Sequence, residues 1–300
     1  MKYEIYPLNR LFPELPKVDF SGYEEKKGRY GFASDEDILK EVNAEPTLAA
    51  YCQHNYREID ARRLRPAVLI CPGGGYRRTS DREAEPVAMQ FLARGYSCFI
   101  LEYTTAFARF PVSLLQLAVS VRYLRENSER FHINPNKIAV CGFSAGGHLA
   151  ASLGVFWKEP FVAGASCVAG SDVRPNALIL CYPVITSGTF AHRDSFRYLL
   201  GEAPDPELLE KLSLEKQVHG GVPPVFLWHT FEDRLVPVEN TFLFADALRK
   251  KQVPFEMHIF PAGMHGLSLA TEEVGPAETY ADAHIAHWIS LCDEWLKLCF

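Results

Sequence analysis

The sequence lacks several features that would assign it to a specialised class of protein. Its eight cysteines include no C-x-x-C pair, and it has no N-x-[ST] sequon, so a zinc knuckle, a thioredoxin motif and N-glycosylation have no support. No apolar run approaches the roughly 20 residues that a membrane-spanning helix needs. Lysine and arginine number 31 against 37 acidic residues, so a chain with a net charge of −6 has no field that would attract nucleic acid.

We expect no secretory signal at the N-terminus, because no basic segment followed by an apolar core occurs there. Four cysteines, Cys71, Cys98, Cys141 and Cys181, lie within short apolar runs, where a free thiol behaves as a small hydrophobe. We therefore expect a reduced, cytoplasmic protein without a nucleic-acid or membrane partner. Nothing in the sequence indicates an oligomeric state.

Six short apolar runs beyond residue 66 predict the strands of a mostly parallel sheet. Most are continuously apolar rather than alternating, as expected of strands that helices cover on both faces. The runs span residues 67–71, 97–101, 137–141, 177–182, 225–229 and 255–260.

Helical patterns separate these runs. The stretch after Pro111 repeats apolar residues every three or four positions, and residues 285–296 do the same. Further helices are expected near Pro86 and over residues 238–250. The alternation of strand and helix predicts right-handed crossovers and a doubly wound α/β fold with helices on both faces of the sheet.

Two regions depart from this alternation, within what we expect to be a single domain. Residues 1–65 form an irregular N-terminal extension with one strand over 47–53, antiparallel at the sheet edge, and a glycine-rich, charged loop over 21–37. Residues 187–224 hold several prolines around a short helical piece at 206–212. This insertion predicts a small cap over the carboxyl edge of the sheet.

The GFSAG segment at residues 142–146 matches the G-x-S-x-G motif. It follows the apolar run at 137–141 directly, and a helix-compatible segment comes after it, as this motif requires. A serine in so sharp a turn presents its hydroxyl above the sheet, which makes Ser144 the candidate nucleophile. A glycine-rich turn with an incidental serine is the alternative.

A serine hydroxyl needs a base, and the base needs an orienting carboxylate, before it can attack a carbonyl near neutral pH. His265 lies in a loop just beyond the last apolar run and is the candidate base. Two adjacent residues, Glu232 and Asp233, follow the run at 225–229 and are the candidate acids. His229, at the end of that run, is expected to support the loop that carries the acid.

Three consecutive glycines, Gly73 to Gly75, follow the first apolar run. Backbone N–H groups of such a loop can bind the oxyanion that forms during acyl transfer. The candidate donors are the N–H groups of Gly74, Gly75 and Ala145. A tight turn or a phosphate-binding nest is the alternative, although no G-K-[ST] or G-x-G-x-x-G pattern follows.

These motifs together resemble the α/β-hydrolase superfamily, and within it the esterase branch that includes acetyl-xylan-esterase-like and feruloyl/acetyl esterase proteins. The resemblance covers residues 67–269 and is carried by PGGGY…SDREAEPVA, NPNKIAVCGFSAGGHLAASL, CYPVIT, PPVFLWHTFEDRLVPVENT and FEMHIFPAGMHGL. It implies an α/β-hydrolase fold, with the glycine loop as an oxyanion hole in which Pro72 replaces the usual histidine. It also implies a triad of Ser144, His265 and Asp233, which selects Asp233 over its acidic neighbour.

The implied activity is that of a serine carboxylic-ester hydrolase that forms an acyl-enzyme and requires no metal or cofactor. Because the insertion at 187–224 is short, we expect short acyl groups, above all acetyl on a small-molecule or oligosaccharide substrate. Tyr76 and Tyr103 come just after predicted strands and are the candidate substrate contacts. Aromatic packing at the rim of the sheet is the alternative for both.

Two other functions stay open at this point. A serine peptidase on the same fold is the nearer one, although such enzymes often carry a propeller or a large N-terminal domain, for which 65 irregular residues are too few. A catalytically silent α/β-hydrolase that serves as a binding module is the other. Such a module would be expected to have lost its triad, whereas all three candidate residues are present here.

Overall fold

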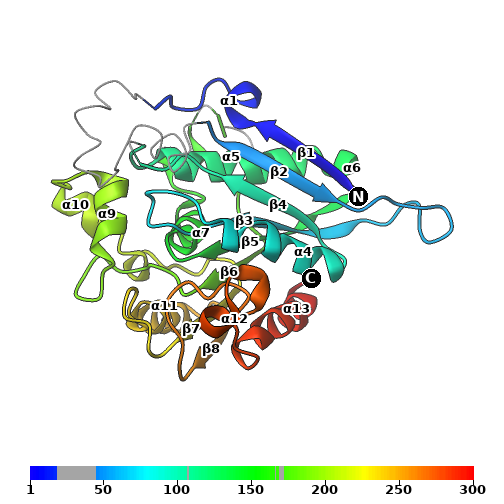
Figure 1. The fold of residues 1–300 in the computed structure, drawn as a ribbon. Coiled ribbons are helices and arrows are strands. Elements are labelled where there is room, and N and C mark those ends of the chain that lie inside the picture. Colours follow the sequence, from blue (N-terminus) through cyan, green and yellow to red (C-terminus); the bar gives the residue numbers. More distant parts are fainter. Residues whose placement is uncertain (19–44, 107, 166, 169–171) are drawn as a thin grey trace.

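The computed structural model describes residues 1–18, 45–106, 108–165, 167–168 and 172–300. The loop expected over residues 21–37 lies outside this part of the chain. A central sheet runs through the molecule, and helices cover both of its faces (Figure 1). This is the predicted α/β-hydrolase architecture.

The sheet has eight strands in the order β1-β2-β4-β3-β5-β6-β7-β8. Six strands, β3 to β8, run parallel, while β1 and β2 are antiparallel to their neighbours. The strands are β1 (Lys2–Pro7), β2 (Thr47–Cys52), β3 (Arg65–Cys71), β4 (Ser97–Glu102), β5 (Ile133–Phe143), β6 (Ala177–Cys181), β7 (Val225–Thr230) and β8 (Phe255–Phe260). The six strands predicted from apolar runs are the six parallel strands, so that prediction is confirmed.

The predicted edge strand is antiparallel as expected, but its position in the sheet is wrong. β2 lies one place in from the edge, and β1 pairs with it along the outside, with Lys2 opposite Cys52. In β1, exposed and partly buried residues alternate, and only Tyr6 is fully buried. An edge strand of this kind has no continuous apolar run, and for that reason the sequence pattern missed it.

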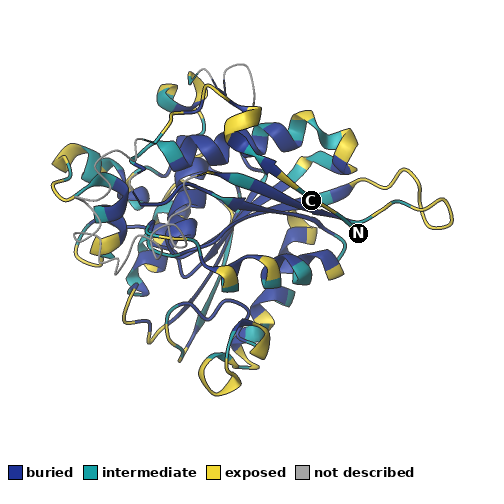
Figure 2. Ribbon diagram, turned by 45° about the horizontal axis from the view of Figure 1, so that its top comes forward, coloured by how far each residue is buried: buried dark blue, intermediate teal, exposed yellow. Residues whose placement is uncertain are grey.

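Five longer helices cover the two faces of the sheet. Neighbouring strand residues point to opposite faces, so that Leu69 joins one buried cluster while Val68 and Ile70 join the other. The first cluster packs under α5 (Val112–Glu126), α7 (Ala145–Phe156) and α11 (Glu239–Lys250), and the second under α4 (Glu85–Ala93) and α13 (Trp288–Cys299). Figure 2 shows the result, with a buried sheet at the centre and exposed residues on the outer helix faces and loops.

The remaining helices are short and lie between these elements. They are α1 (Leu8–Leu11), α6 (Ser128–Phe131), α8 (Pro160–Ala163), α9 (Arg193–Leu200), α10 (Pro206–Lys211) and α12 (Ala277–Tyr280), with single 3-10 turns η1 (Asp81–Glu83), η2 (Leu214–Lys216), η3 (Glu272–Val274) and η4 (Ile285–His287). The insertion at 187–224 therefore contains α9, α10 and η2. Figure 1 shows α9 and α10 beside the sheet.

All eight cysteines are free thiols, and seven of them are buried. The four that were predicted to pack within strands are fully enclosed there. Among the described residues, no helix combines the length and the apolar character that crossing a lipid bilayer demands.

Candidate active site

Ser144 occupies the sharp turn between β5 and α7, with a φ of 53° and a ψ of −117°. A residue with a side chain rarely adopts a positive φ, so the surrounding structure must hold it. The Ser144 N–H donates to the carbonyl of Cys181 at 3.0 Å, and its own carbonyl accepts from the N–H of Val184 at 3.0 Å. A Cβ on Gly146 would lie 2.1 Å from the carbonyl oxygen of Cys71, so only glycine lets α7 start this close to β3.

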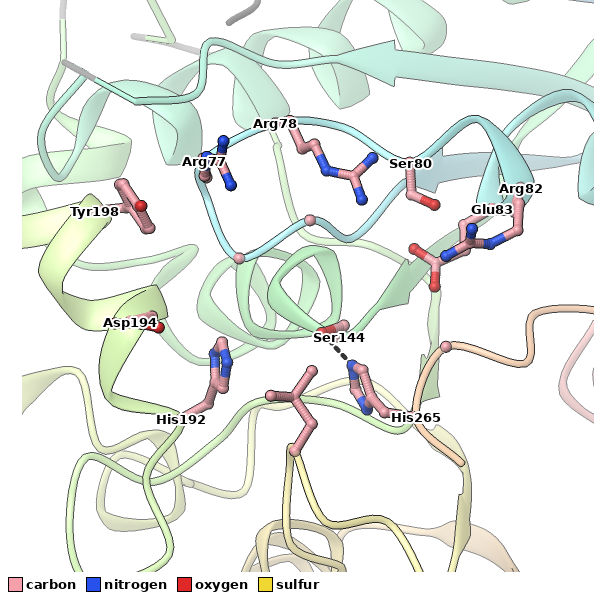
Figure 3. Close-up of a pocket in the computed structure, with 14 residues that line it drawn as sticks. Arg77, Arg78, Ser80, Arg82, Glu83, Ser144, His192, Asp194, Tyr198 and His265 are labelled. Atoms are coloured by element: carbon pink, nitrogen blue, oxygen red, sulfur yellow. Dashed lines mark hydrogen bonds between the residues drawn. The ribbon is translucent and has the colours of Figure 1, made fainter. Parts of the chain in front are cut away.

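The three predicted catalytic side chains come together in one hydrogen-bonded chain. His265 Nε2 lies 2.8 Å from Ser144 Oγ, and His265 Nδ1 lies 2.6 Å from Asp233 Oδ2 (Figure 3 shows the first contact). An ionised carboxylate only accepts hydrogen bonds, so Nδ1–H donates to Asp233 and Nε2 accepts from the serine hydroxyl. The three residues follow β5, β7 and β8, whose carboxyl ends meet at one edge of the sheet.

The carboxylate of Asp233 is fully buried, yet well supplied with donors. The N–H groups of Leu235 and Val236 donate to Oδ1 at 3.0 and 2.9 Å, and His229 Nε2 lies 3.1 Å from Oδ2. Burial alone would raise the pKa of Asp233, but the hydrogen bonds from His229 and His265 outweigh it and place the pKa well below its usual range. This carboxylate therefore stays ionised.

His229 fixes the loop that carries the acid, as expected from its place at the end of β7. Its Nε2 also lies 3.0 Å from the carbonyl oxygen of Val236, which can only accept, so Nε2 carries the proton. The Thr241 hydroxyl then donates to Nδ1 at 2.8 Å. Glu232, the alternative acid, is exposed, so the inward-pointing carboxylate of the pair is that of Asp233.

The glycine loop lies directly against the serine. A Cβ on Gly73 would come within 2.9 Å of the Ser144 Cβ, and one on Gly74, whose φ is 123°, would lie 2.2 Å from the carbonyl oxygen of Arg78. The Gly73 N–H already donates to Glu83. Within the described part of the chain, no acceptor bonds the N–H of Gly74 or Gly75.

The N–H of Ala145 is the third candidate donor. Ala145 is the first residue of α7, and the first N–H groups of a helix have no acceptor within it. Gly74 and Gly75 line the pocket, whereas Ala145 is buried. An oxyanion hole formed by these three N–H groups stays a prediction.

Glu83 is a buried carboxyl beside the serine that the sequence analysis missed. Its Oε2 accepts from the Gly73 N–H and its Oε1 from the Tyr182 hydroxyl, both at 2.7 Å. Burial raises the pKa of Glu83, although these two hydrogen bonds and the nearby His265 oppose the change. The segment SDREAEPVA contains Glu83, but nothing close in sequence marks its partners.

Tyr182 extends this contact to the histidine loop. Its hydroxyl accepts from the Ser268 N–H at 3.0 Å, and its ring meets the edge of His265 with a centroid distance of 5.0 Å. Glu83 and Tyr182 thus connect the glycine loop with the loop that carries the base.

The predicted substrate contacts, Tyr76 and Tyr103, need correction. Both side chains are buried, and neither lines the pocket. The Tyr76 hydroxyl donates to Nδ1 of His148 at 2.9 Å, and the Tyr103 hydroxyl donates to the carbonyl of Pro72 at 2.7 Å. Tyr76 has a φ of 60°, which helps to turn its ring inward, so these tyrosines support the glycine loop from behind.

Ser144 and His265 open into a cavity of about 320 Å³. Figure 3 shows its walls: the segment from Gly74 to Glu83 on one side, and His192, Asp194 and Tyr198 from the insertion on another. The site is therefore a small polar pocket whose lining includes Ser144, hydrogen-bonded to His265.

Comparison with known proteins places this arrangement among esterases and related hydrolases. The chain is 42% identical over 232 residues to endo-1,4-beta-xylanase B of Butyrivibrio fibrisolvens, covering 76% of this chain and 35% of that protein. It is 30% identical over 211 residues to an acetylxylan esterase of Xylanibacter ruminicola, covering 68% of this chain and 42% of that protein. The chain thus spans less than half of the length of either relative.

Solved structures match over a larger share of their length. The acetyl ester-xyloside bifunctional hydrolase of Caldicellulosiruptor lactoaceticus has a TM-score of 0.76 at 38% identity, covering 89% of this chain and 94% of that one. The carboxylesterase Cest-2923 of Lactobacillus plantarum has a TM-score of 0.76 at 26% identity, covering 86% and 94%.

These findings confirm the resemblance to α/β-hydrolase esterases of the acetyl-xylan-esterase-like branch. The family model described as BD-FAE matches residues 56–248, well over half of the chain, and includes the glycine loop, Ser144 and Asp233. The chain belongs to the BD-FAE family.

Proposed function

We propose that this protein is a serine carboxylic-ester hydrolase. The observation that carries the proposal is the continuous hydrogen-bond chain from Ser144 through His265 to Asp233, beside a pocket that Ser144, His265 and the glycine loop line. A hydroxyl bonded to an imidazole, itself oriented by an ionised carboxylate, is the arrangement that activates serine for acyl transfer.

In the first half of the reaction, Ser144 Oγ attacks the ester carbonyl while His265 Nε2 takes the hydroxyl proton. Asp233 stabilises the resulting imidazolium. The N–H groups of Gly74, Gly75 and Ala145 stabilise the oxyanion, and one such donor is typically worth about 3 kcal/mol of the barrier.

The tetrahedral intermediate then collapses, and the C–O bond to the alcohol breaks. The leaving alcohol takes the proton from His265, and the acyl group stays on Ser144. Water repeats the sequence: His265 takes its proton, the hydroxide attacks the acyl-enzyme, and the carboxylic acid leaves as Ser144 regains its proton.

We further propose short acyl groups, above all acetyl on carbohydrates, as substrates. The cavity of about 320 Å³ supports this, since it lies at the small end of the range of roughly 300–1,000 Å³ for ligand pockets. The name of the acetylxylan esterase relative points to the same class, and that of the xylanase relative to a carbohydrate. We place the reaction in the cytoplasm, in keeping with the free cysteines, where imported oligosaccharides rather than polymeric xylan would be met.

Hydrolysis of 4-nitrophenyl acetate, butyrate and octanoate tests this proposal, together with release of acetate from acetylated xylo-oligosaccharides. We expect kcat/KM to fall as the acyl chain lengthens, and the Ser144→Ala variant to be inactive. Preference for octanoate would contradict the assignment to short acyl groups. Cleavage of aminoacyl arylamides without any ester hydrolysis would instead indicate a serine peptidase.

A further inference from the structure

Three arginines line the pocket of a protein whose net charge is negative. Arg77, Arg78 and Arg82 border the same cavity as Ser144 and His265, although the chain as a whole carries a charge of −6. Figure 3 shows that all three come from the segment that follows the glycine loop and lie along one side of the pocket. Positive charge is thus gathered where a substrate would bind.

Two carboxylates outside the triad border the same pocket, and neither neutralises Arg78. Glu83 is buried and already accepts hydrogen bonds from Gly73 and Tyr182. Asp194 lies on the wall formed by α9, and its Oδ1 is 3.6 Å from a guanidinium nitrogen of Arg197 (Figure 3 shows its place).

Arg78 and Arg82 differ in what holds them. The guanidinium of Arg78 is exposed and makes no hydrogen bond or ion pair with any residue that the structure describes. The guanidinium of Arg82 lies 5.0 Å from the centre of the Tyr280 ring, and its positive charge acts to lower the pKa of Glu83. Its buried Nε has no hydrogen-bond acceptor among the described residues. All the N–H groups of the Arg78 guanidinium are therefore available to a ligand, and the Nε–H of Arg82 adds a further donor.

Resting on the proposed esterase function, we propose that the site selects esters whose alcohol portion carries an anionic group, a carboxylate or a phosphate, bound by Arg78 with support from Arg82. A guanidinium matches both anions because its planar N–H groups pair with two oxygens at once. An acetyl group has no position for a charge, so the anion belongs to the alcohol. The substrate class is an O-acetylated sugar acid or sugar phosphate.

Matched acetyl esters test this inference. The substrates are O-acetylated methyl glucoside, O-acetylated methyl glucuronoside and O-acetylated glucose 6-phosphate, with kcat and KM measured from acetate release. We expect kcat/KM to be about tenfold higher for at least one anionic ester than for the neutral one, chiefly through KM, in line with a charge-assisted hydrogen bond. The advantage should shrink as ionic strength rises. The two anionic arms show whether carboxylate or phosphate is preferred.

Substitutions assign the preference to Arg78. Arg78→Gln should bring the anionic-to-neutral ratio of kcat/KM close to one, and Arg78→Glu should bring it below one. Arg57→Gln is the matched control. Arg57 is exposed on the segment that leads into the amino end of β3, whereas the pocket lies at the carboxyl ends of the parallel strands. This variant loses the same charge and should keep the ratio of the unmodified protein.

Two results would overturn the inference. One is equal kcat/KM for all three esters, with acetate released from each; the esterase function then stands and only the anionic preference fails. The other is a ratio that favours the anionic esters but does not change in Arg78→Glu. If acetate is released neither from the three sugar esters nor from 4-nitrophenyl acetate, the proposed function is contradicted, and this inference with it.

Discussion

The buried carboxyl of Glu83 accepts a hydrogen bond of 2.7 Å from the N–H of Gly73, the first glycine of the loop beside the serine. Its other oxygen accepts a hydrogen bond from the Tyr182 hydroxyl, which in turn accepts one from the N–H of Ser268 in the loop that carries His265. Two loops that meet at the active site are therefore held at a fixed spacing by one carboxyl and one phenol.

Replacing Glu83 by glutamine tests this positioning role. The glutamine amide can accept from only one of the two donors, so either Gly73 or Tyr182 faces an N–H group instead. Leaving a buried donor unpaired costs about 1–3 kcal/mol. We expect kcat to fall about 10- to 100-fold with KM nearly unchanged.

The matched control for that variant is Glu85→Gln, which changes an exposed carboxylate at the start of α4. Steady-state kinetics with 4-nitrophenyl acetate and the midpoint of thermal unfolding should be measured for both. An unaltered kcat in Glu83→Gln would show that the glycine loop holds its position without this carboxyl.

Asp233→Asn tests the orientation of the base. Asparagine can keep the backbone hydrogen bonds to Oδ1, but it turns an N–H toward Nδ1 of His265 and favours the wrong tautomer of the imidazole. By comparison with the same change in other triads, kcat should fall about 10⁴-fold. Glu232→Asn, at the exposed neighbour, should have little effect on kcat. A large loss of kcat in Glu232→Asn but not in Asp233→Asn would identify Glu232 as the acid that orients His265.

His148 makes stability depend on pH. Burial lowers its pKa from 6.5 to about 4, partly opposed by the hydrogen bond to the Leu212 carbonyl. The unfolded chain thus binds a proton between these two values that the folded protein does not, so stability falls as pH drops below about 6.5 and levels off below about 4. From pH 8 to pH 4.5 this residue should account for a loss of about 2.5 kcal/mol.

Denaturant unfolding of His148→Gln at both pH values measures this contribution. The variant is expected to be less stable at pH 8, because glutamine does not reproduce the ring, but to lose about 2.5 kcal/mol less than the unmodified protein on acidification. His54→Gln, an exposed control, should keep the full pH dependence. The same acid loss in His148→Gln as in the unmodified protein would refute the assignment.

Tyr76→Phe distinguishes support of the glycine loop from substrate contact. The hydroxyl donates only to His148 among the described residues, so its removal leaves Nδ1 buried without a donor. We expect a loss of about 1–3 kcal/mol in the free energy of unfolding and no change in KM for acetylated sugars. A several-fold rise in KM without a loss of stability would restore Tyr76 as a substrate contact.

Part of this arrangement is predictable from the sequence because single local patterns encode it. Most of the parallel strands are continuous apolar runs, and the turn around Ser144 needs small residues at fixed positions, which gives a recognisable motif. Other parts depend on contacts across the chain. Glu83 and Tyr182 lie 99 positions apart, and nothing near either residue indicates the partner.

The direction in which a side chain points is also not predictable from the sequence pattern. Tyr76 follows the glycine loop, where a side chain could face the pocket or the core, and its backbone at a positive φ sends it inward. β1 escaped prediction for a related reason, since one exposed face removes the apolar run that marked the other strands.

The central claim is that Ser144 is a nucleophile activated by His265. The most direct measurement is mass spectrometry of the intact protein and its peptides after reaction with a fluorophosphonate. We predict one covalent adduct on the peptide that contains Ser144, absent from Ser144→Ala and formed far more slowly in His265→Ala. An unlabelled protein that is fully folded, or an adduct on another residue, would contradict the account.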